Sequence, residues 1–181
     1  MNEWLKLSEK RRLEILNQVN SQTGLPTDAI EKDWWVTITL KAIFSSKFAQ
    51  HLVFKGGTSL SKAYNLIERF SEDIDLSIDR TMLGFEGELS KTQIKKLRKA
   101  SGNFIVGEFK EELISELEKL GVNKENYNLI FDDDIDDTSD PHRIELEYNS
   151  VCDTDKGAAC VRGIDTRVAP DLTTTVPVRE V

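Results

Sequence analysis

The stretch FKGGTSLSKAYNLIERFSEDIDLSI, residues 54–78, decides the fold of this 181-residue chain. It begins within an apolar burst, HLVFK (51–55), passes two adjacent glycines, continues with a helical spacing of apolar residues and ends in strict alternation. In that last part Ile74, Leu76 and Ile78 alternate with polar residues, which is typical of a half-buried strand. The order of strand, glycine turn, helix and strand predicts a mixed α/β domain.

Carboxylates accompany the predicted strands. Asp73 and Asp75 lie two residues apart, so their side chains leave the same face of one strand. The segment RIELEYNSV (143–151) alternates again and presents Glu145 and Glu147. Because carboxylate oxygens are the ligands that Mg²⁺ prefers, we expect Asp73, Asp75 and Glu147, with Glu145 as the alternative, to hold Mg²⁺ or Mn²⁺ for phosphoryl chemistry.

The glycine turn fits a phosphate-binding role. Gly56 and Gly57 allow the backbone to adopt conformations closed to other residues and to approach a ligand closely. The amides at the start of the following helix can then face a triphosphate, and Thr58 and Ser59 add hydroxyl donors.

Three basic residues flank this turn. Lys55, Lys62 and Arg69 could each neutralise triphosphate charge, and the sequence does not rank them. A P-loop is excluded, because KGGTS (55–59) lacks the earlier glycine and the Gly-Lys-Ser/Thr ending of that motif.

Periodicity elsewhere predicts further elements. The run WWVTIT (34–39) also fits a strand, so helix and strand both stay open there. Thr27 is the expected N-cap of a helix over residues 27–46, with Glu31 in its first turn. The tail after Cys152 predicts one or two edge strands. The expected helices are 8–19, 27–46, 58–70, 89–100 and about 102–120, with strands at 127–131 and 143–151.

The composition describes an ordinary globular chain. It is 39% hydrophobic, has no apolar run that could span a bilayer and starts without a signal peptide, which predicts a cytoplasmic protein. A net charge of -8 argues against passive nucleic-acid binding, apart from a basic run at Lys91–Lys99 that reads as a solvated helix face. The acidic run 132–140 lacks the glycine of an EF-hand, and the two cysteines and two histidines match no common zinc site.

The combined motif resembles the signature of the AbiEii/AbiGii-type toxin nucleotidyltransferases, within the DNA-polymerase-beta-like superfamily. The lead-in IEKDWWVTITLKAIF (30–44) is similar as well, and the resemblance covers about residues 25–80 and, more loosely, the RIELEY strand. It implies a small mixed β-sheet flanked by helices, with N-terminal helices. Residues 1–181 are then one nucleotidyltransferase-like domain, with a helical lead-in (1–48) and a catalytic α/β core (49–181) that lacks the family's C-terminal helical region.

The resemblance also implies a function. It implies the toxin of a bacterial toxin–antitoxin or phage abortive-infection module, which transfers a nucleotide from a nucleoside triphosphate to an acceptor hydroxyl such as a tRNA end, with a cognate antitoxin as partner. The carried-over site residues are Gly56, Gly57, Thr58, Ser59, Asp73 and Asp75, and more loosely Glu147.

Two alternatives stay open. The first is a non-catalytic module that binds an antitoxin or another basic partner and keeps a vestigial site. The second is a small-molecule nucleotidyltransferase of the antibiotic-modifying kind, which would use the same carboxylates with a different acceptor. Metal-dependent triphosphate binding would distinguish the nucleotidyltransferase from the non-catalytic module. The acceptor, tRNA or a small alcohol, would distinguish it from the antibiotic-modifying enzyme.

Overall fold

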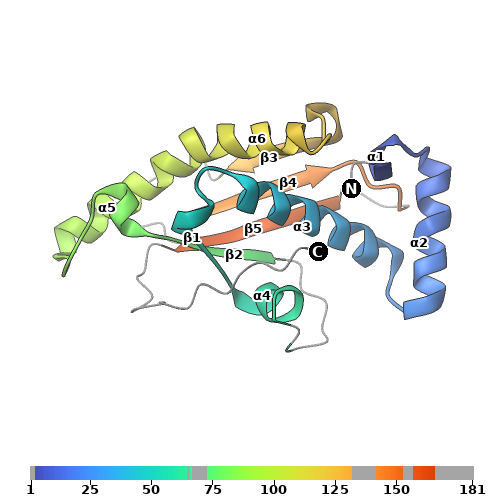
Figure 1. Cartoon of the computed structure of the whole chain (residues 1–181), viewed down its shortest axis with the longest axis horizontal. Helices are drawn as coiled ribbons and strands as arrows, with labels where there is room; N and C mark the ends of the chain where they lie inside the picture. The colour runs from blue at the N-terminus through green and yellow to red at the C-terminus, as the bar shows by residue number, and fades with distance from the viewer. Residues whose placement is uncertain (1–2, 65, 67–72, 132–141, 153–156, 166–181) are drawn as a thin grey trace.

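The structure is a computed structural model that describes residues 3–64, 66, 73–131, 142–152 and 157–165, with only the backbone of 142 and 158–165. Within these residues the centre is a five-stranded mixed sheet in the order β1-β2-β5-β4-β3 (Figure 1). Strands β2 and β5 run parallel, and the other neighbouring strands are antiparallel. The strands are β1 (Leu52–Lys55), β2 (Asp73–Ile78), β3 (Tyr127–Phe131), β4 (His142–Tyr148) and β5 (Gly157–Asp165).

Helices α3, α4 and α6 lie against the sheet, whereas α1 and α2 lie beyond one of its ends and α5 beyond the other (Figure 1). Helices α3 and α6 cross the face toward the viewer, and α4 lies below the edge formed by β1 and β2 (Figure 1). The predicted α/β fold class, a small mixed sheet flanked by helices, is confirmed. The helices are α1 (Glu3–Lys6), α2 (Glu9–Thr23), α3 (Thr27–Ser45), α4 (Gly56–Lys62), α5 (Lys91–Phe104) and α6 (Lys110–Lys119), with shorter turns at Ala49–His51, Arg80–Leu83, Lys124–Asn126 and Ile105–Phe109.

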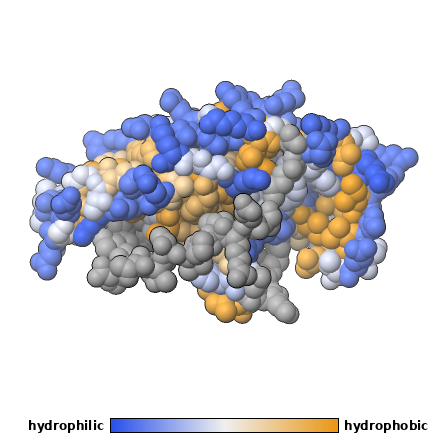
Figure 2. Space-filling view, in the orientation of Figure 1, coloured by the Kyte–Doolittle hydropathy of each residue, from blue (hydrophilic) through white to orange (hydrophobic). Residues whose placement is uncertain are grey.

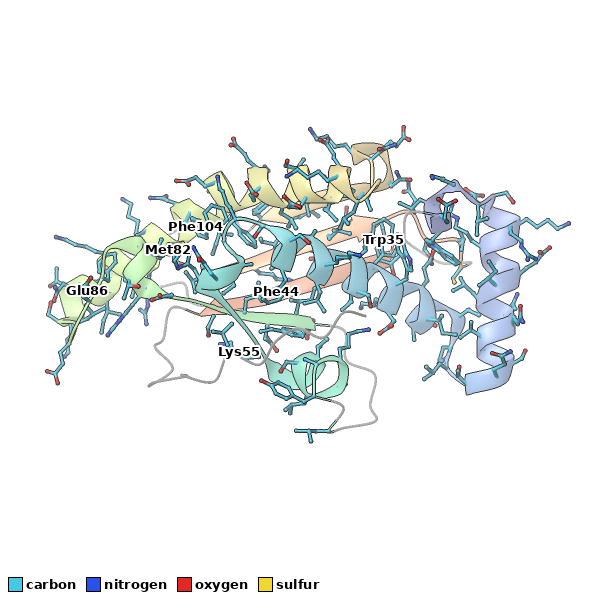
Figure 3. All side chains as sticks on the ribbon, in the orientation of Figure 1. Trp35, Phe44, Lys55, Met82, Glu86 and Phe104 are labelled. Atoms are coloured by element: carbon cyan, nitrogen blue, oxygen red, sulfur yellow. The ribbon has the colours of Figure 1, made fainter. Side chains whose placement is uncertain are left out.

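Alternation along the strands separates a core face from a polar face. Ile74 and Leu76 of β2 and Ile144 and Leu146 of β4 have no exposed surface and pack in one cluster with α3 and α6. Trp35 of α3 completes this layer, with its ring stacked 4.8 Å from that of Tyr148 (Figure 3). The residues between them along β2 and β4 therefore face the other side of the sheet.

Helix α3 resolves the open reading of residues 34–39 in favour of a helix. Its long helical frame buries Trp35 and Ile38 together, which a strand with alternating faces would separate. The predicted cap was wrong by one residue: Pro26 occupies the N-cap and Thr27 is the first helical residue. Pro is well suited to a helix start because it has no N–H to satisfy.

Glu31 does not cap the first turn of α3 but lies fully buried against the loop after β4. Its carboxylate accepts hydrogen bonds from the Ser150 hydroxyl at 2.6 Å and from the Val151 N–H at 3.1 Å. The Glu31 carboxylate therefore joins α3 to the chain that leads into β5. Burial raises the pKa of the neighbouring Cys152 thiol, so this cysteine stays protonated near neutral pH.

We expect Glu31→Ala to lower the free energy of unfolding by about 2–4 kcal/mol, because it removes a fully buried carboxylate that accepts from the part-buried Ser150 hydroxyl and Val151 N–H. Urea denaturation measures the change. Glu14→Ala is the control, since Glu14 forms only an exposed ion pair with Arg11. We expect the control to change stability by less than about 0.5 kcal/mol, and equal losses in the two variants would contradict the role of Glu31.

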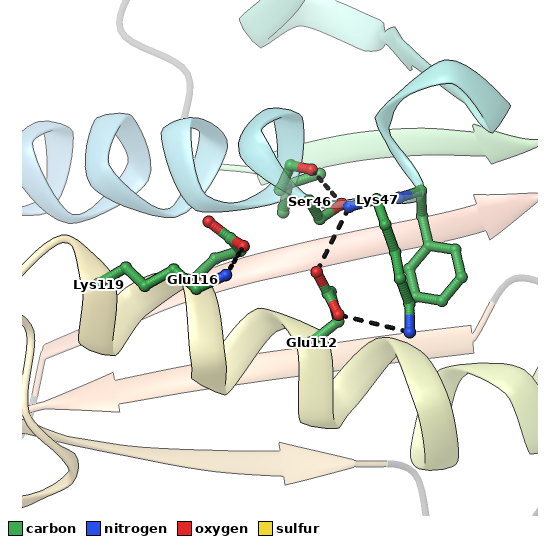
Figure 4. A network of polar contacts seen from close by, with 7 residues as sticks. Ser46, Lys47, Glu112, Glu116 and Lys119 are labelled. Carbon is green, nitrogen blue, oxygen red and sulfur yellow. Dashed lines mark hydrogen bonds and ion pairs between the residues drawn. The ribbon is translucent and has the colours of Figure 1, made fainter.

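Polar contacts fix the end of α3 against α6. The Lys47 amide and ammonium both approach the Glu112 carboxylate, at 3.4 and 3.5 Å (Figure 4). The Ser46 hydroxyl donates to the Ile43 carbonyl at 2.6 Å and closes the helix end. These contacts place the start of β1 relative to the core.

The predicted helices at 89–100 and 102–120 form one nearly continuous element. Helix α5 passes through a π-helical segment, Ile105–Phe109, directly into α6. Gly107 has a non-helical backbone conformation there, which gives the chain its kink. The Ser90 cap forms a capping box with Gln93, so the start of α5 agrees with the sequence.

The tail strand was predicted at an edge, and this was wrong. Strand β5 lies in the middle of the sheet, between β2 and β4. The segment Gly157–Asp165, GAACVRGID, is rich in small and apolar residues, which suits a strand with neighbours on both sides, but it has no regular alternation to reveal it. At its start, a methyl group on Gly157 would overlap the Tyr148 ring.

Tyr127 on β3 has a buried hydroxyl that, within the described residues, finds no hydrogen-bond partner. Burial, with Glu118 nearby, raises the pKa of Tyr127 from 10.0 to about 12. The neutral ring is therefore the form that the fold favours. The stabilisation that comes from the difference between the unfolded and folded pKa of Tyr127 is fully present below pH 10. It is lost as the pH rises through the folded pKa of about 12.

We expect Tyr127→Phe to stabilise the protein by about 1 kcal/mol at pH 7, because it removes an unsatisfied buried hydroxyl. The advantage should grow as the pH is raised above 10. Urea titrations of both proteins at neutral and alkaline pH measure the difference, and a less stable variant at neutral pH would show that the hydroxyl has a partner.

Candidate functional site

The glycine pair does not form a separate turn but opens α4 directly after β1. Gly56 has φ +76°, a left-handed conformation that only glycine adopts at little cost. A methyl group at this position would overlap the Asp75 carboxylate. The glycine is therefore required twice, for its backbone angle and for the close approach of α4 to Asp75.

Residues Gly56–Ser59 form the first turn of α4, and Thr58 and Ser59 are buried in it. The Thr58 hydroxyl donates to the backbone carbonyl of Asp73, which joins α4 to β2. The Ser59 hydroxyl donates to the Gly56 carbonyl at 2.8 Å. These two hydroxyls hold the shape of the turn, whereas the sequence had suggested them as direct phosphate donors.

The predicted helix from Thr58 to Phe70 is shorter in its described part. Helix α4 ends at Lys62, and the bond from the Leu66 N–H to the Leu60 carbonyl, 2.8 Å, closes its end. Residues 65 and 67–72 lie outside the described part of the chain, and Arg69 is among them.

Asp73 and Asp75 occupy the polar face of β2, as the alternation predicted. Both are half-buried, whereas Ile74 between them is fully buried. Lys55 of β1 stands directly opposite Asp75 in the strand register, at the junction of β1 and α4 (Figure 3). Residues paired in this way have Cβ atoms about 5 Å apart. Of the two described cations that the sequence left unranked, Lys55 is the one whose register position is opposite an aspartate of the site.

Lys62 lies elsewhere. Its ammonium is 2.7 Å from an oxygen of Asp33 and 2.9 Å from the Thr37 hydroxyl, both on α3. The side chain that the sequence assigned to the triphosphate is thus engaged with a neighbouring helix.

The register separates the two glutamates of β4. Asp73 and Glu145 both pair with Cys160 of the intervening strand, so they stand level across the sheet, about 10 Å apart. Glu147 pairs with Ala158, about 7 Å further along β4.

Their hydrogen bonds also differ. Glu145 is ion-paired with Arg143 at 2.8 Å. Glu147 accepts from the Asn128 amide at 3.4 Å and lines a shallow hollow with Tyr127 and Asn128 of β3. The geometry places Glu145 nearer to the Asp73–Asp75 pair than Glu147.

Oxygen ligands of the kind that magnesium requires are present at β2. Among the described residues, no group of three or more His, Cys, Asp or Glu side chains lies close enough together to hold a metal ion. Magnesium in phosphoryl-transfer sites is commonly bound by one or two carboxylates together with substrate phosphates and water. Asp73 and Asp75 fit that demand, and the Asp75 carboxylate lies directly against Gly56.

Other candidates from the sequence do not converge on this site. Lys91, Lys95, Lys96 and Lys99 of α5 are exposed, whereas Arg98 is half-buried and Leu97 is buried. Helix α5 itself lies beyond the Ile78 end of β2 (Figure 1). Among the described helices, none has both the length and the apolar character needed to cross a membrane. The acidic run 132–140 lies outside the described residues.

Comparison with known families decides the relationship. The family model described as the nucleotidyl transferase AbiEii toxin of type IV toxin–antitoxin systems matches residues 38–173. The chain belongs to the AbiEii family. The match contains α4, β2, β4 and β5 together, so it covers the whole arrangement of glycines and carboxylates. No curated protein and no solved structure matched the chain in the same comparisons.

Membership in the AbiEii family confirms the resemblance inferred from residues 54–78. The family is one of nucleotidyl transferase toxins from toxin–antitoxin systems, which implies a nucleotide substrate and an antitoxin partner. Two features of the arrangement escaped the sequence. They are the central place of β5 and the pairing of Lys62 with α3, because neither leaves a local pattern along the chain.

Proposed function

We propose that this AbiEii protein is a magnesium- or manganese-dependent nucleotidyltransferase that transfers a nucleotide to an RNA hydroxyl such as a tRNA end. The observation that carries the proposal is the contact of Gly56 with Asp75. It brings a glycine turn and an Asp-x-Asp strand into one place, where phosphates and a cation can meet. Its working compartment would be the cytoplasm, where triphosphates and tRNA are found.

In this proposal each residue has one task. The turn Gly56–Ser59 receives the phosphates, and Lys55, opposite Asp75, offsets their charge. Asp73 and Asp75 hold the metal ion, which supplies charge stabilisation to the triphosphate. One domain over residues 1–181 carries these groups, and a cognate antitoxin is the protein partner.

The reaction follows from these placements. The acceptor oxygen attacks the α-phosphorus, the bond from that phosphorus to the bridging oxygen of the β-phosphate breaks, and pyrophosphate leaves. A β4 carboxylate, Glu147 or Glu145, takes the proton of the attacking hydroxyl. The register favours Glu145 for this task, and the single variants Glu145→Gln and Glu147→Gln compare the two directly.

A transfer assay tests the proposal. The purified protein is incubated with each labelled nucleoside triphosphate, magnesium and either total tRNA or a mixture of small alcohols, with EDTA as the control. Label on tRNA that requires magnesium supports the proposal. Label on small alcohols alone supports the antibiotic-modifying alternative, and no label with either acceptor contradicts transfer by this chain.

A further inference from the structure

Helix α4 buries polar rather than apolar side chains. Its buried residues are Thr58 and Ser59, whereas Leu60 is 39% exposed and Leu66, just beyond its end, is 70% exposed. Figure 2 shows an apolar patch at the lower edge of the molecule, where α4 lies. Because tertiary packing of an apolar face is what usually stabilises a short helix, α4 depends on other anchors.

Two polar links tie α4 to its neighbours. At its start, the Thr58 hydroxyl bonds to the carbonyl of Asp73 on β2. One turn later, the Lys62 ammonium contacts Asp33 at 2.7 Å and Thr37 at 2.9 Å on α3. Residues four apart lie on the same side of a helix, so both anchors act on one side of α4.

We propose that Asp33 is a positioning residue of the site. Through Lys62 it sets where α4, and with it the Gly56–Ser59 turn, lies relative to Asp73 and Asp75. The inference rests on the function proposed above, in which that turn receives the phosphates. Asp33 itself belongs to α3 and touches neither strand carboxylate in this role.

The alternative is that Lys62 contacts the phosphates directly. The geometry favours the positioning role, because the ammonium already has two oxygen partners and only 26% of the Lys62 side chain is exposed. Lys55 stands opposite Asp75 in the strand register, so another cation is already placed at the carboxylates. An ion pair that is partly exposed contributes little to overall stability, so its main effect should be local.

The first part of the test uses the protein without nucleotide. Hydrogen–deuterium exchange is measured for Asp33→Asn, for Lys62→Met and for the charge exchange Asp33→Lys with Lys62→Asp. We expect both single variants to speed exchange of the amides of α4 and the charge exchange to restore protection. Glu112→Gln is the matched control, because it breaks an ion pair with Lys47 between other elements (Figure 4). Unchanged exchange in α4 in both single variants would overturn the proposal.

The second part measures triphosphate affinity and the KM and kcat of transfer. Each single variant is expected to raise KM about tenfold, the double variant Asp33→Asn with Lys62→Met is expected to be no worse than either, and the charge exchange is expected to recover most of the loss. Loss in Lys62→Met alone, without recovery in the charge exchange, would show that Lys62 binds phosphate directly and would overturn the positioning role. If the wild type binds no triphosphate, the proposed function fails, and the exchange measurement still decides the role of Asp33.

Discussion

Replacing Asp73 and Asp75 together by asparagine is expected to abolish magnesium-dependent triphosphate binding and nucleotide transfer. The two carboxylates share the polar face of β2 and supply the hard oxygen ligands of the proposed site. The loss should exceed the roughly 100-fold that removal of an outer-shell partner costs a metal site. The measurement is the rate of labelled-nucleotide transfer over a range of magnesium concentrations.

The matched control for this double variant is Glu86→Gln with Glu88→Gln. These two glutamates are also two residues apart, are exposed in the loop before α5, and change the net charge by the same amount. We expect the control to transfer nucleotide at the wild-type rate. Equal loss in both double variants would mean that general charge, and not the β2 site, governs the activity.

Gly56→Ala is expected to cause the second large effect. The left-handed backbone at φ +76° costs an alanine about 1–2 kcal/mol. The added methyl group would also push the Asp75 carboxylate away from α4. A displacement of about 1 Å in a site of this kind lowers rates on the order of 100-fold. We therefore expect a stable but nearly inactive protein.

Gly84→Ala separates the two causes. Gly84 has φ +82°, close to that of Gly56, but nothing lies within 4 Å of the position an added methyl group would take. Both melting temperatures should fall because of the shared backbone cost, with a larger fall in Gly56→Ala because of the overlap with Asp75, and only Gly56→Ala should lose transfer activity. If Gly56→Ala stayed as active as Gly84→Ala, the contact with Asp75 would have no functional role.

Local patterns made the functional strands predictable. Alternation over Asp73–Ile78 and over His142–Tyr148 identified β2 and β4 and the faces of their carboxylates, because a strand with one buried face repeats every two residues. The two adjacent glycines likewise predicted a backbone conformation that other residues avoid, and Gly56 has a positive φ. These features depend on neighbours along the chain, which the sequence shows directly.

Features that depend on distant partners were not predictable in the same way. The central place of β5 is decided by its parallel pairing with β2, which lies far from it in the sequence, on the side opposite its neighbour β4. Lys62 flanks the glycine motif in the sequence and was therefore a candidate phosphate ligand, but its partner Asp33 lies on α3. The sequence placed Glu31 in the first turn of a helix, but its carboxylate accepts hydrogen bonds from Ser150 and Val151, which are distant in the sequence. The order of Glu145 and Glu147 relative to Asp73 also needed the register of an intervening strand.

The central claim is that Asp73 and Asp75, beside the Gly56 turn, bind a nucleoside triphosphate with magnesium. Calorimetric titration of each of the four ribonucleoside triphosphates into the protein tests it most directly, with magnesium and then with EDTA. We predict binding of at least one triphosphate that requires magnesium and disappears in the Asp73→Asn, Asp75→Asn variant. Binding that persists in that variant, or no binding of any triphosphate with magnesium present, would contradict the claim.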